Sequence, residues 1–118
     1  MAVEVNITDG AFRATQAMAQ PLHQAVDVSK HDQLDLGLNV YSVEGSPGTG
    51  VEVALITGMQ METEDGWADL GSFTLVTLPN KVEKKNFPGL FKFARWKVRS
   101  MGSFTAVTFS VRGMGRQN

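Results

Sequence analysis

The alternation of apolar and polar residues between positions 34 and 40 constrains the fold of this chain more than any other feature. Four aliphatic residues occupy every second position of this segment, namely Leu34, Leu36, Leu38 and Val40. Side chains of an extended strand point alternately to its two faces, so the segment predicts a strand that is buried on one face only. A helix would need apolar residues at a period of 3.6, which this segment lacks.

Further segments with strand character follow, separated by clusters of residues that favour turns. They cover residues 51–55, 72–78, 91–99 and 104–112, and the last of them turns Thr105, Val107, Phe109 and Val111 towards one face. The glycine-rich run 45–50 joins segments 34–40 and 51–55 and predicts a hairpin. Seven to eight short strands at this turn spacing predict an all-β chain that folds as an antiparallel β-sandwich or a jelly roll.

The first part of the chain allows two readings. Thr8 and Asp9 could cap a short helix that ends before Pro21. In the competing extended reading, residues 3–7 alternate between apolar and polar side chains, and residues 25–28 form a second strand.

Length and composition are those of one soluble globular domain. A chain of 118 residues is long enough for one core but too short for two ordinary domains. We therefore expect a single domain over residues 1–118, with residues 1–24 as a possible N-terminal arm.

Cysteine is absent, which excludes disulfides, thiolate metal sites and a cysteine nucleophile. The sequence shows no signal-peptide pattern and no apolar run of membrane-spanning length, so we expect no membrane contact, and the compartment stays undetermined.

Acidic and basic residues are segregated along the chain. Residues 1–70 contain eleven Asp and Glu against two Lys and Arg, and residues 71–118 contain nine Lys and Arg against one Glu. The formal net charge of −1 therefore combines segments of about −9 and +8. Such segregation suits binding to a charged partner or to other copies of the chain.

The segment 81–99 mixes basic and aromatic residues and supplies the interface candidates, which are Lys92, Arg95, Lys97, Arg99, Phe87 and Phe91. Three interpretations are open, in decreasing order of preference: a solvated strand face, contact with an acidic surface of another subunit, and a single-stranded nucleic-acid groove. Strand alternation places Arg95, Lys97 and Arg99 towards solvent and Trp96 towards the core. Phe87 and Phe91 either pack inside or form an exposed apolar patch.

Trp67 is the candidate for a ligand contact in an alternative function. An aromatic ring beside the carboxylates of Asp65 and Asp69 could stack on a sugar ring, and the competing interpretation is that Trp67 packs over one end of the sandwich. The alternative function is a carbohydrate-binding or adhesion module with a glycan as its partner.

No motif in the chain specifies a reaction. His23 and His31 lie eight residues apart, which is not a zinc-site spacing. The glycine-rich run 45–50 lacks the lysine of a phosphate loop, and the acidic residues in segment 62–69 do not follow the calcium-loop pattern. We therefore expect no catalytic residue, no metal ligand and no cofactor, and not an enzyme.

The order of the strand and turn segments resembles that of small β-sandwich structural proteins encoded by tailed bacteriophages and prophages. The resemblance covers residues 25–112 and rests on segments 26–28, 34–38, 51–55, 65–67, 70–73 and 108–111. Proteins of this class are built into the virion as capsid decoration or cementing proteins, or as head or tail accessories, often as symmetric oligomers. The resemblance implies a non-catalytic assembly role, homo-oligomeric contacts or other virion proteins as partners, and a place in the virion. It implies no catalytic residues, and the basic stretch 81–99 matches no feature of the class.

Overall fold

The computed structural model describes residues 2–46, 48 and 50–117. These residues form ten β-strands and one short 3₁₀ helix, η1 (Leu22–Gln24), and no α-helix. The strands are β1 (Ala2–Asn6), β2 (Phe12–Ala14), β3 (Met18–Ala19), β4 (Val26–Asp27), β5 (Gln33–Gly45), β6 (Glu52–Gly58), β7 (Ala68–Ser72), β8 (Lys81–Pro88), β9 (Phe93–Ser100) and β10 (Phe104–Arg116). The all-β class predicted from the sequence is confirmed.

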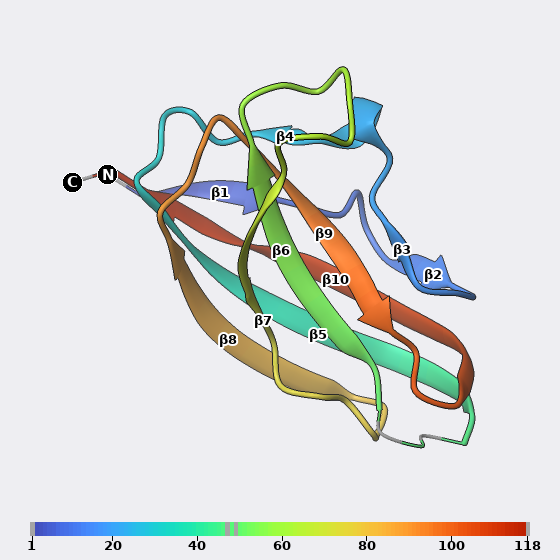
Figure 1. The fold of residues 1–118 in the computed structure, drawn as a ribbon. Helices are drawn as coiled ribbons and strands as arrows, with labels where there is room; N and C mark the ends of the chain where they lie inside the picture. The colour runs from blue at the N-terminus through green and yellow to red at the C-terminus, as the bar shows by residue number, and fades with distance from the viewer. Residues whose placement is uncertain (1, 47, 49, 118) are drawn as a thin grey trace.

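The strands form two antiparallel sheets that pack face to face (Figure 1). Sheet A has the order β1-β10-β5-β8, and sheet B has the order β3-β9-β6-β7. β1 and β2 pair with successive parts of β10, and β3 and β4 pair with successive parts of β9, so each pair acts as one interrupted edge strand. If β1 with β2 and β3 with β4 are each counted as one strand, the described residues form eight strands. Their order is then 1-8-3-6 in sheet A and 2-7-4-5 in sheet B. This is the strand order of a jelly roll.

The core lies between the two sheets and consists of the inward side chains of alternating strands. The four aliphatic residues of β5 that the sequence pattern identified, Leu34, Leu36, Leu38 and Val40, are at most 1 % exposed. Aromatic rings pack beside them, with the ring centroid of Trp96 5.3 Å from that of Phe109 and 4.8 Å from that of Phe12. Trp96 therefore faces the core, as predicted, and burial of this apolar surface is the main favourable contribution to folding.

The predicted hairpin between segments 34–40 and 51–55 is wrong. β5 pairs with β10 and β8 in sheet A, whereas β6 pairs with β9 and β7 in sheet B. The connection between them crosses from one sheet to the other, and residues 47 and 49 of the predicted turn lie outside the described residues. Both strands have an apolar face, and these faces meet across the core. Alternation identifies the buried face but not the neighbouring strand.

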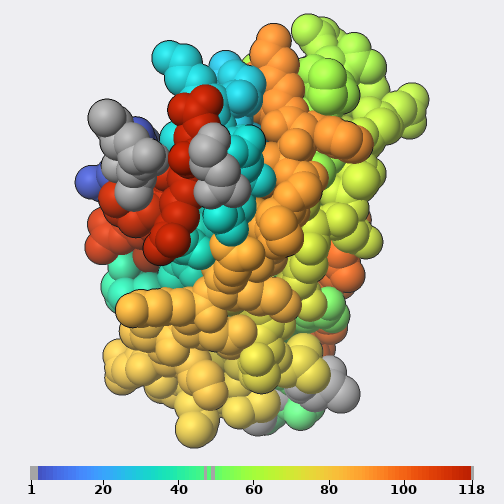
Figure 2. All heavy atoms as spheres, turned by 90° about the vertical axis from the view of Figure 1, so that its left-hand side faces the viewer, coloured from blue at the N-terminus to red at the C-terminus, as the bar shows by residue number. Residues whose placement is uncertain are grey.

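Two other strands differ from the sequence-based expectation. The strand expected over 72–78 is displaced, because β7 ends at Ser72 and Val76 makes only a single bridge to Val51. β8 was not predicted, since Phe87 is the only one of its residues that is buried. β8 is an edge strand of sheet A and lies along the lower part of the face shown in Figure 2.

A bulge changes the expected pattern at the start of β10. The pairing register with β5 shifts between Phe104 and Ala106. As a result Thr105 is exposed, whereas Val107, Phe109 and Val111 face the core as predicted. A bulge inserts one extra residue into a strand, so the residues that face the core shift by one position.

The N-terminal residues follow the extended reading. No helix forms over residues 8–21; instead, β1 and β2 pair with β10, and β3 pairs with β9. Val5 and Ile7 are buried in the core, and the strand expected within 25–28 is present as β4. The described residues 2–24 are therefore part of the sandwich and do not form a separate arm.

Candidate functional site

The acidic and basic halves of the chain pair with one another inside the fold. Five ion pairs connect described residues, and four of them join an acidic residue of the first 70 positions to a basic residue of the rest. These four are Arg95–Glu64, Arg99–Glu52, Arg99–Asp69 and Arg116–Asp35. Jelly-roll connectivity places segments from the two halves side by side in both sheets. The segregation seen in the sequence is thus partly neutralised within the molecule.

Arg95 does not face solvent as predicted; it is 1 % exposed. Its Nε donates to the carbonyl oxygen of Gln20 at 2.7 Å, and its two Nη atoms donate to the Glu64 carboxylate at 2.9 and 3.1 Å. These bonds hold the pKa of Glu64 below its ordinary value. Alternation correctly placed Arg95 on the outer face of sheet B, but Glu64 and Trp67 of the connection between β6 and β7 pack on it there. An outer face is exposed only where no loop packs on it.

Trp67 belongs to the same packed cluster. The guanidinium of Arg95 lies 4.8 Å from the centroid of its ring, and its Nε1 donates to the carbonyl oxygen of Thr63 at 2.9 Å. A Cβ at position 58 would lie 2.8 Å from the Trp67 ring, so the ring needs Gly58 beneath it. One side of the indole therefore rests on sheet B, in agreement with packing over the sandwich.

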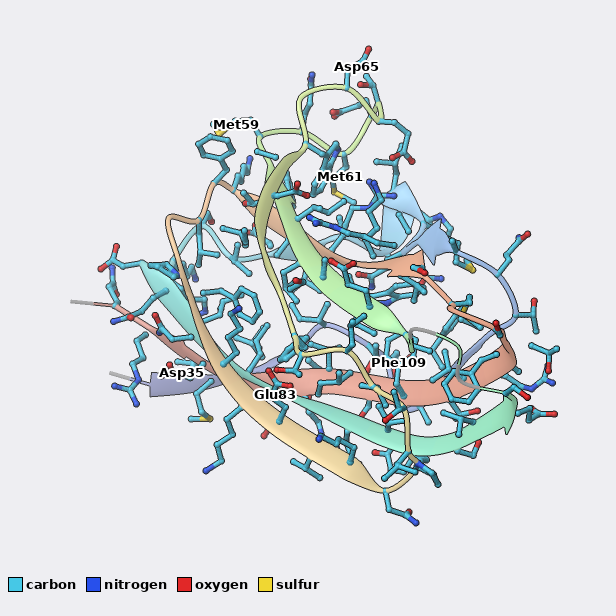
Figure 3. The ribbon with its side chains drawn as sticks, turned by 60° about the horizontal axis from the view of Figure 1, so that its bottom comes forward. Asp35, Met59, Met61, Asp65, Glu83 and Phe109 are labelled. Carbon is cyan, nitrogen blue, oxygen red and sulfur yellow. The ribbon has the colours of Figure 1, made fainter. Side chains whose placement is uncertain are left out.

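The two carboxylates expected beside Trp67 have different environments. Asp69 forms an ion pair with Arg99. Asp65 is exposed in the connection between β6 and β7, close to the extremity of the molecule in Figure 3. The two carboxylates therefore do not act as a matched pair.

The other interface candidates are scattered. Phe87 is fully buried and packs edge to face on Phe73, so it cannot belong to an interface. Phe91, Lys92 and Lys97 are exposed. Because Arg95 and Arg99 are engaged in internal ion pairs, β9 does not present a continuous basic row.

A groove on the outer face of sheet A is the feature best suited to bind a partner. It has a volume of about 520 Å³ and is lined by outward residues of β5, β8 and β10. Gly37 forms its floor, and the strand register places Arg112 on one side and Lys84 on the other. Neighbouring strands are about 4.8 Å apart, so the two cationic residues start roughly 10 Å apart with no side chain between them. We call this feature the Gly37 groove.

The charges around the Gly37 groove leave it electropositive. The carboxylate of Asp35 is bound by Arg116 and accepts a hydrogen bond from Asn86 at 2.8 Å. The side chains of Lys84 and Arg112 have no ion-pair or hydrogen-bond partner among the described residues. Free cations therefore flank the floor, while the acid beside them is neutralised.

Apolar side chains accompany these cations. Met114 and Val82, which line the Gly37 groove, are 39 % and 65 % exposed. Sequence reasoning missed this site because β8 shows no apolar alternation, and without β8 nothing joins Lys84 to Arg112. The available signal was Gly37 itself, a residue without a side chain in the middle of a strongly predicted strand.

A cavity of about 410 Å³ opens at the other edge of the sandwich, where β1 and β2 of sheet A approach β3 and β4 of sheet B. Trp96 and Phe12 contribute aromatic surface, and Thr8, Gln20 and Asn6 contribute polar groups. We call it the Trp96 cavity.

The metal-ligating residue types do not gather in the part of the chain that the structure describes. No group of three or more His, Asp or Glu side chains there is arranged to hold a metal ion. His23 is exposed, and the ring of His31 packs against Gly115. Among the described residues no helix is long and apolar enough to cross a membrane.

The fold and these sites define a jelly-roll domain with an electropositive, partly apolar groove on one sheet. Comparison of the chain with protein-family models, with characterised proteins and with solved structures found no match.

Proposed function

We propose that the chain is a non-catalytic structural subunit of a larger particle, such as a capsid decoration protein or a head or tail accessory of a virion. The observation that carries this proposal is the Gly37 groove, where unpaired cations lie beside exposed apolar side chains. Apolar area supplies most of the affinity of a subunit contact, and complementary charge supplies its register and association rate.

The fold supports the same role by analogy. Jelly rolls are used repeatedly by viral capsid proteins and also by lectins. Because one fold serves many functions, the argument depends on the groove and takes only modest support from the topology. An acidic surface of another subunit is the partner that fits the groove.

The experiment is the molar mass in solution by light scattering, at low and at high salt. We expect wild-type protein to form an assembly that dissociates as salt rises, because salt screens the charge contacts. The variant Lys84→Glu with Arg112→Glu should be monomeric at low salt. A matched control, Lys30→Glu with Lys97→Glu, makes the same change in net charge at exposed positions away from the groove and should assemble normally. A wild-type chain that is monomeric throughout and does not copurify with particles contradicts the proposal.

A carbohydrate-binding or adhesion module is the second candidate. The observation in its favour is that Trp67 is held rigidly by Gly58, Arg95 and Thr63 and remains partly exposed, as a stacking platform must be. A glycan array without signal, or a Trp67→Ala variant that binds glycans as before, removes this candidate.

A further inference from the structure

We infer that the Trp96 cavity binds a small, neutral, hydroxyl-rich ring such as a pyranose sugar. This site is separate from the Gly37 groove, and the inference does not depend on the proposed assembly role. It depends on the shape, the wall and the charge of the cavity.

The cavity has the size of a small-molecule site. Its volume of about 410 Å³ lies within the range of roughly 300 to 1,000 Å³ that ligand sites span. It is at the lower end of that range, which suits one or two small rings rather than a long chain.

The wall of the cavity is rigid because Gln20 joins the two sheets. This residue is 3 % exposed, and its Nε2 donates to the carbonyl oxygens of Ile7 at 2.7 Å and Gln24 at 3.0 Å. Its Oε1 accepts from the backbone N–H of Trp96 at 3.2 Å. All three bonds are internal, so Gln20 fixes the shape of the site and leaves recognition to its neighbours.

Two residues that line this cavity, Trp96 and Thr8, carry donors without a protein acceptor. Trp96 is 2 % exposed, yet its indole Nε1–H has no acceptor among the described residues. The hydroxyl of Thr8, which is 3 % exposed, accepts from the backbone N–H of Val111 at 3.0 Å, and its own proton has no acceptor in the described part of the chain. Donors without a protein acceptor bind water or a ligand.

Charge and aromatic surface select the kind of ligand. No Lys, Arg or His lines the cavity, and Asp9 at its rim is the one ionisable lining residue in the described part of the chain. A phosphate or carboxylate would find no cation here. The apolar face of a sugar ring fits the partly exposed ring of Phe12, while its hydroxyls can meet Thr8 and the indole N–H of Trp96.

The two tryptophans of the chain make a direct test possible. In ¹⁵N-labelled protein only Trp67 and Trp96 give indole N–H signals, and the variant Trp67→Phe assigns them. Glucose, galactose and N-acetylglucosamine are each titrated at millimolar concentrations, with inorganic phosphate as the anionic probe. We expect at least one sugar to shift the Trp96 signal saturably, while the Trp67 signal, whose N–H is bonded to Thr63, stays in place.

A blocking variant separates binding from unspecific effects. Ala11 is exposed at the cavity wall, so Ala11→Phe should fill the opening and weaken the apparent sugar affinity at least tenfold. Ala17→Phe introduces the same ring at an exposed position that does not line the cavity, and it should bind like wild type. The inference is overturned if no sugar gives a saturable shift, if only Trp67 responds, or if Ala11→Phe binds as wild type does.

Discussion

The guanidinium of Arg95 is a charge that the fold buries and must therefore satisfy. Removing it from water is costly unless hydrogen bonds replace those to the solvent. Glu64 supplies two of these bonds and the Gln20 carbonyl a third, while the Trp67 ring lies against the guanidinium. This cluster holds the connection between β6 and β7 against sheet B. The stability of this packing therefore depends on the charge of Glu64.

We expect Glu64→Gln to lower the stability of the folded chain. Because the Glu64 side chain is 68 % exposed, solvent compensates part of the lost interaction, and the expected loss in the free energy of unfolding is about 1 kcal/mol at pH 7. Urea unfolding measures it. Glu62→Gln removes a nearby exposed carboxylate and serves as control; an equal loss in both variants would show that general charge, and not the Arg95 contact, is responsible.

The same contact predicts a pH dependence. Arg95 bonds lower the pKa of folded Glu64, so this carboxyl stabilises the fold fully above its unfolded pKa of about 4.3. The contribution is lost as pH falls through the lower folded value. As pH falls below that unfolded value, wild type should therefore lose its advantage over Glu64→Gln progressively, and the two unfolding midpoints should approach one another. A constant difference below that pH contradicts the assignment.

Residue environments were only partly predictable from the sequence. Trp96 was placed in the core correctly, because alternation within a strand depends on local geometry alone. The burial of Arg95 was not predictable in this way, since it depends on a loop that begins more than thirty residues earlier. The same holds for Lys84 and Arg112, which become neighbours only through the pairing of β5 with both β8 and β10.

At the scale of elements, β5 organises sheet A and carries the floor of the Gly37 groove. Its inner face is fully apolar, whereas its outer face has a gap at Gly37. A Cβ at this position would lie 3.6 Å from the carbonyl oxygen of Arg112 and 3.8 Å from that of Glu83, which are ordinary contacts. The backbone therefore does not require glycine here, and the absence of a side chain leaves the groove open.

We expect Gly37→Thr to separate stability from binding. A β-branched residue suits a strand interior, so the free energy of unfolding should be unchanged or rise by up to about 1 kcal/mol. The added side chain fills the groove, so assembly measured by light scattering should weaken. Unimpaired assembly of this stable variant would mean that the groove is not the contact surface.

Gly113 in β10 provides the contrast. A Cβ there would collide with the backbone of Asp35 and Leu36, which cannot yield as a flexible side chain does. Gly113→Ala should therefore destabilise the chain by about 1–3 kcal/mol, as measured by urea unfolding. If Gly113→Ala leaves the free energy of unfolding unchanged, the two strands can separate locally at this point.

Elements were predicted where one face is apolar and missed where it is not. β5 and most of β10 follow a period of two and were found. β8 is an edge strand with one buried residue, and its pairing is set by backbone hydrogen bonds to β5 that leave no trace in hydropathy. The wrong hairpin has the same origin, because a glycine-rich turn can connect two strands of one sheet or two strands on opposite sheets.

At the scale of the whole molecule, the jelly roll decides which charges remain free. Internal pairing uses Glu64, Asp69 and Asp35 from the acidic half. Glu62 and Asp65, in the connection between β6 and β7, remain exposed and form no ion pair with described residues. Met59 in the same connection is also exposed. Figure 3 shows Asp65 and Met59 far from Asp35 and Glu83 of the sheet that carries the groove. The two surfaces cannot meet within one molecule but can meet between copies.

This geometry predicts a head-to-tail contact if the proposed assembly is formed by the chain itself. The Gly37 groove of one copy would bind the acidic connection of the next, and such heterologous contacts build rings or open filaments. We expect Lys84→Glu with Arg112→Glu to abolish assembly, and Glu62→Lys with Asp65→Lys to do the same. Each variant should remain monomeric alone because it presents two surfaces of like charge.

The decisive measurement mixes the two variants or combines all four substitutions in one chain. The combined chain carries an acidic groove and a basic connection, so complementarity returns and assembly should reappear at low salt. In the mixture, the native groove of one variant meets the native connection of the other, and the reversed groove of that other variant meets the reversed connection of the first. Both contacts join opposite charges, so alternating assemblies of the two variants should form at low salt. Light scattering distinguishes these assemblies from the monomers that each variant forms alone. Assembly by wild type without recovery in the combined chain would place the acidic partner surface elsewhere on the chain.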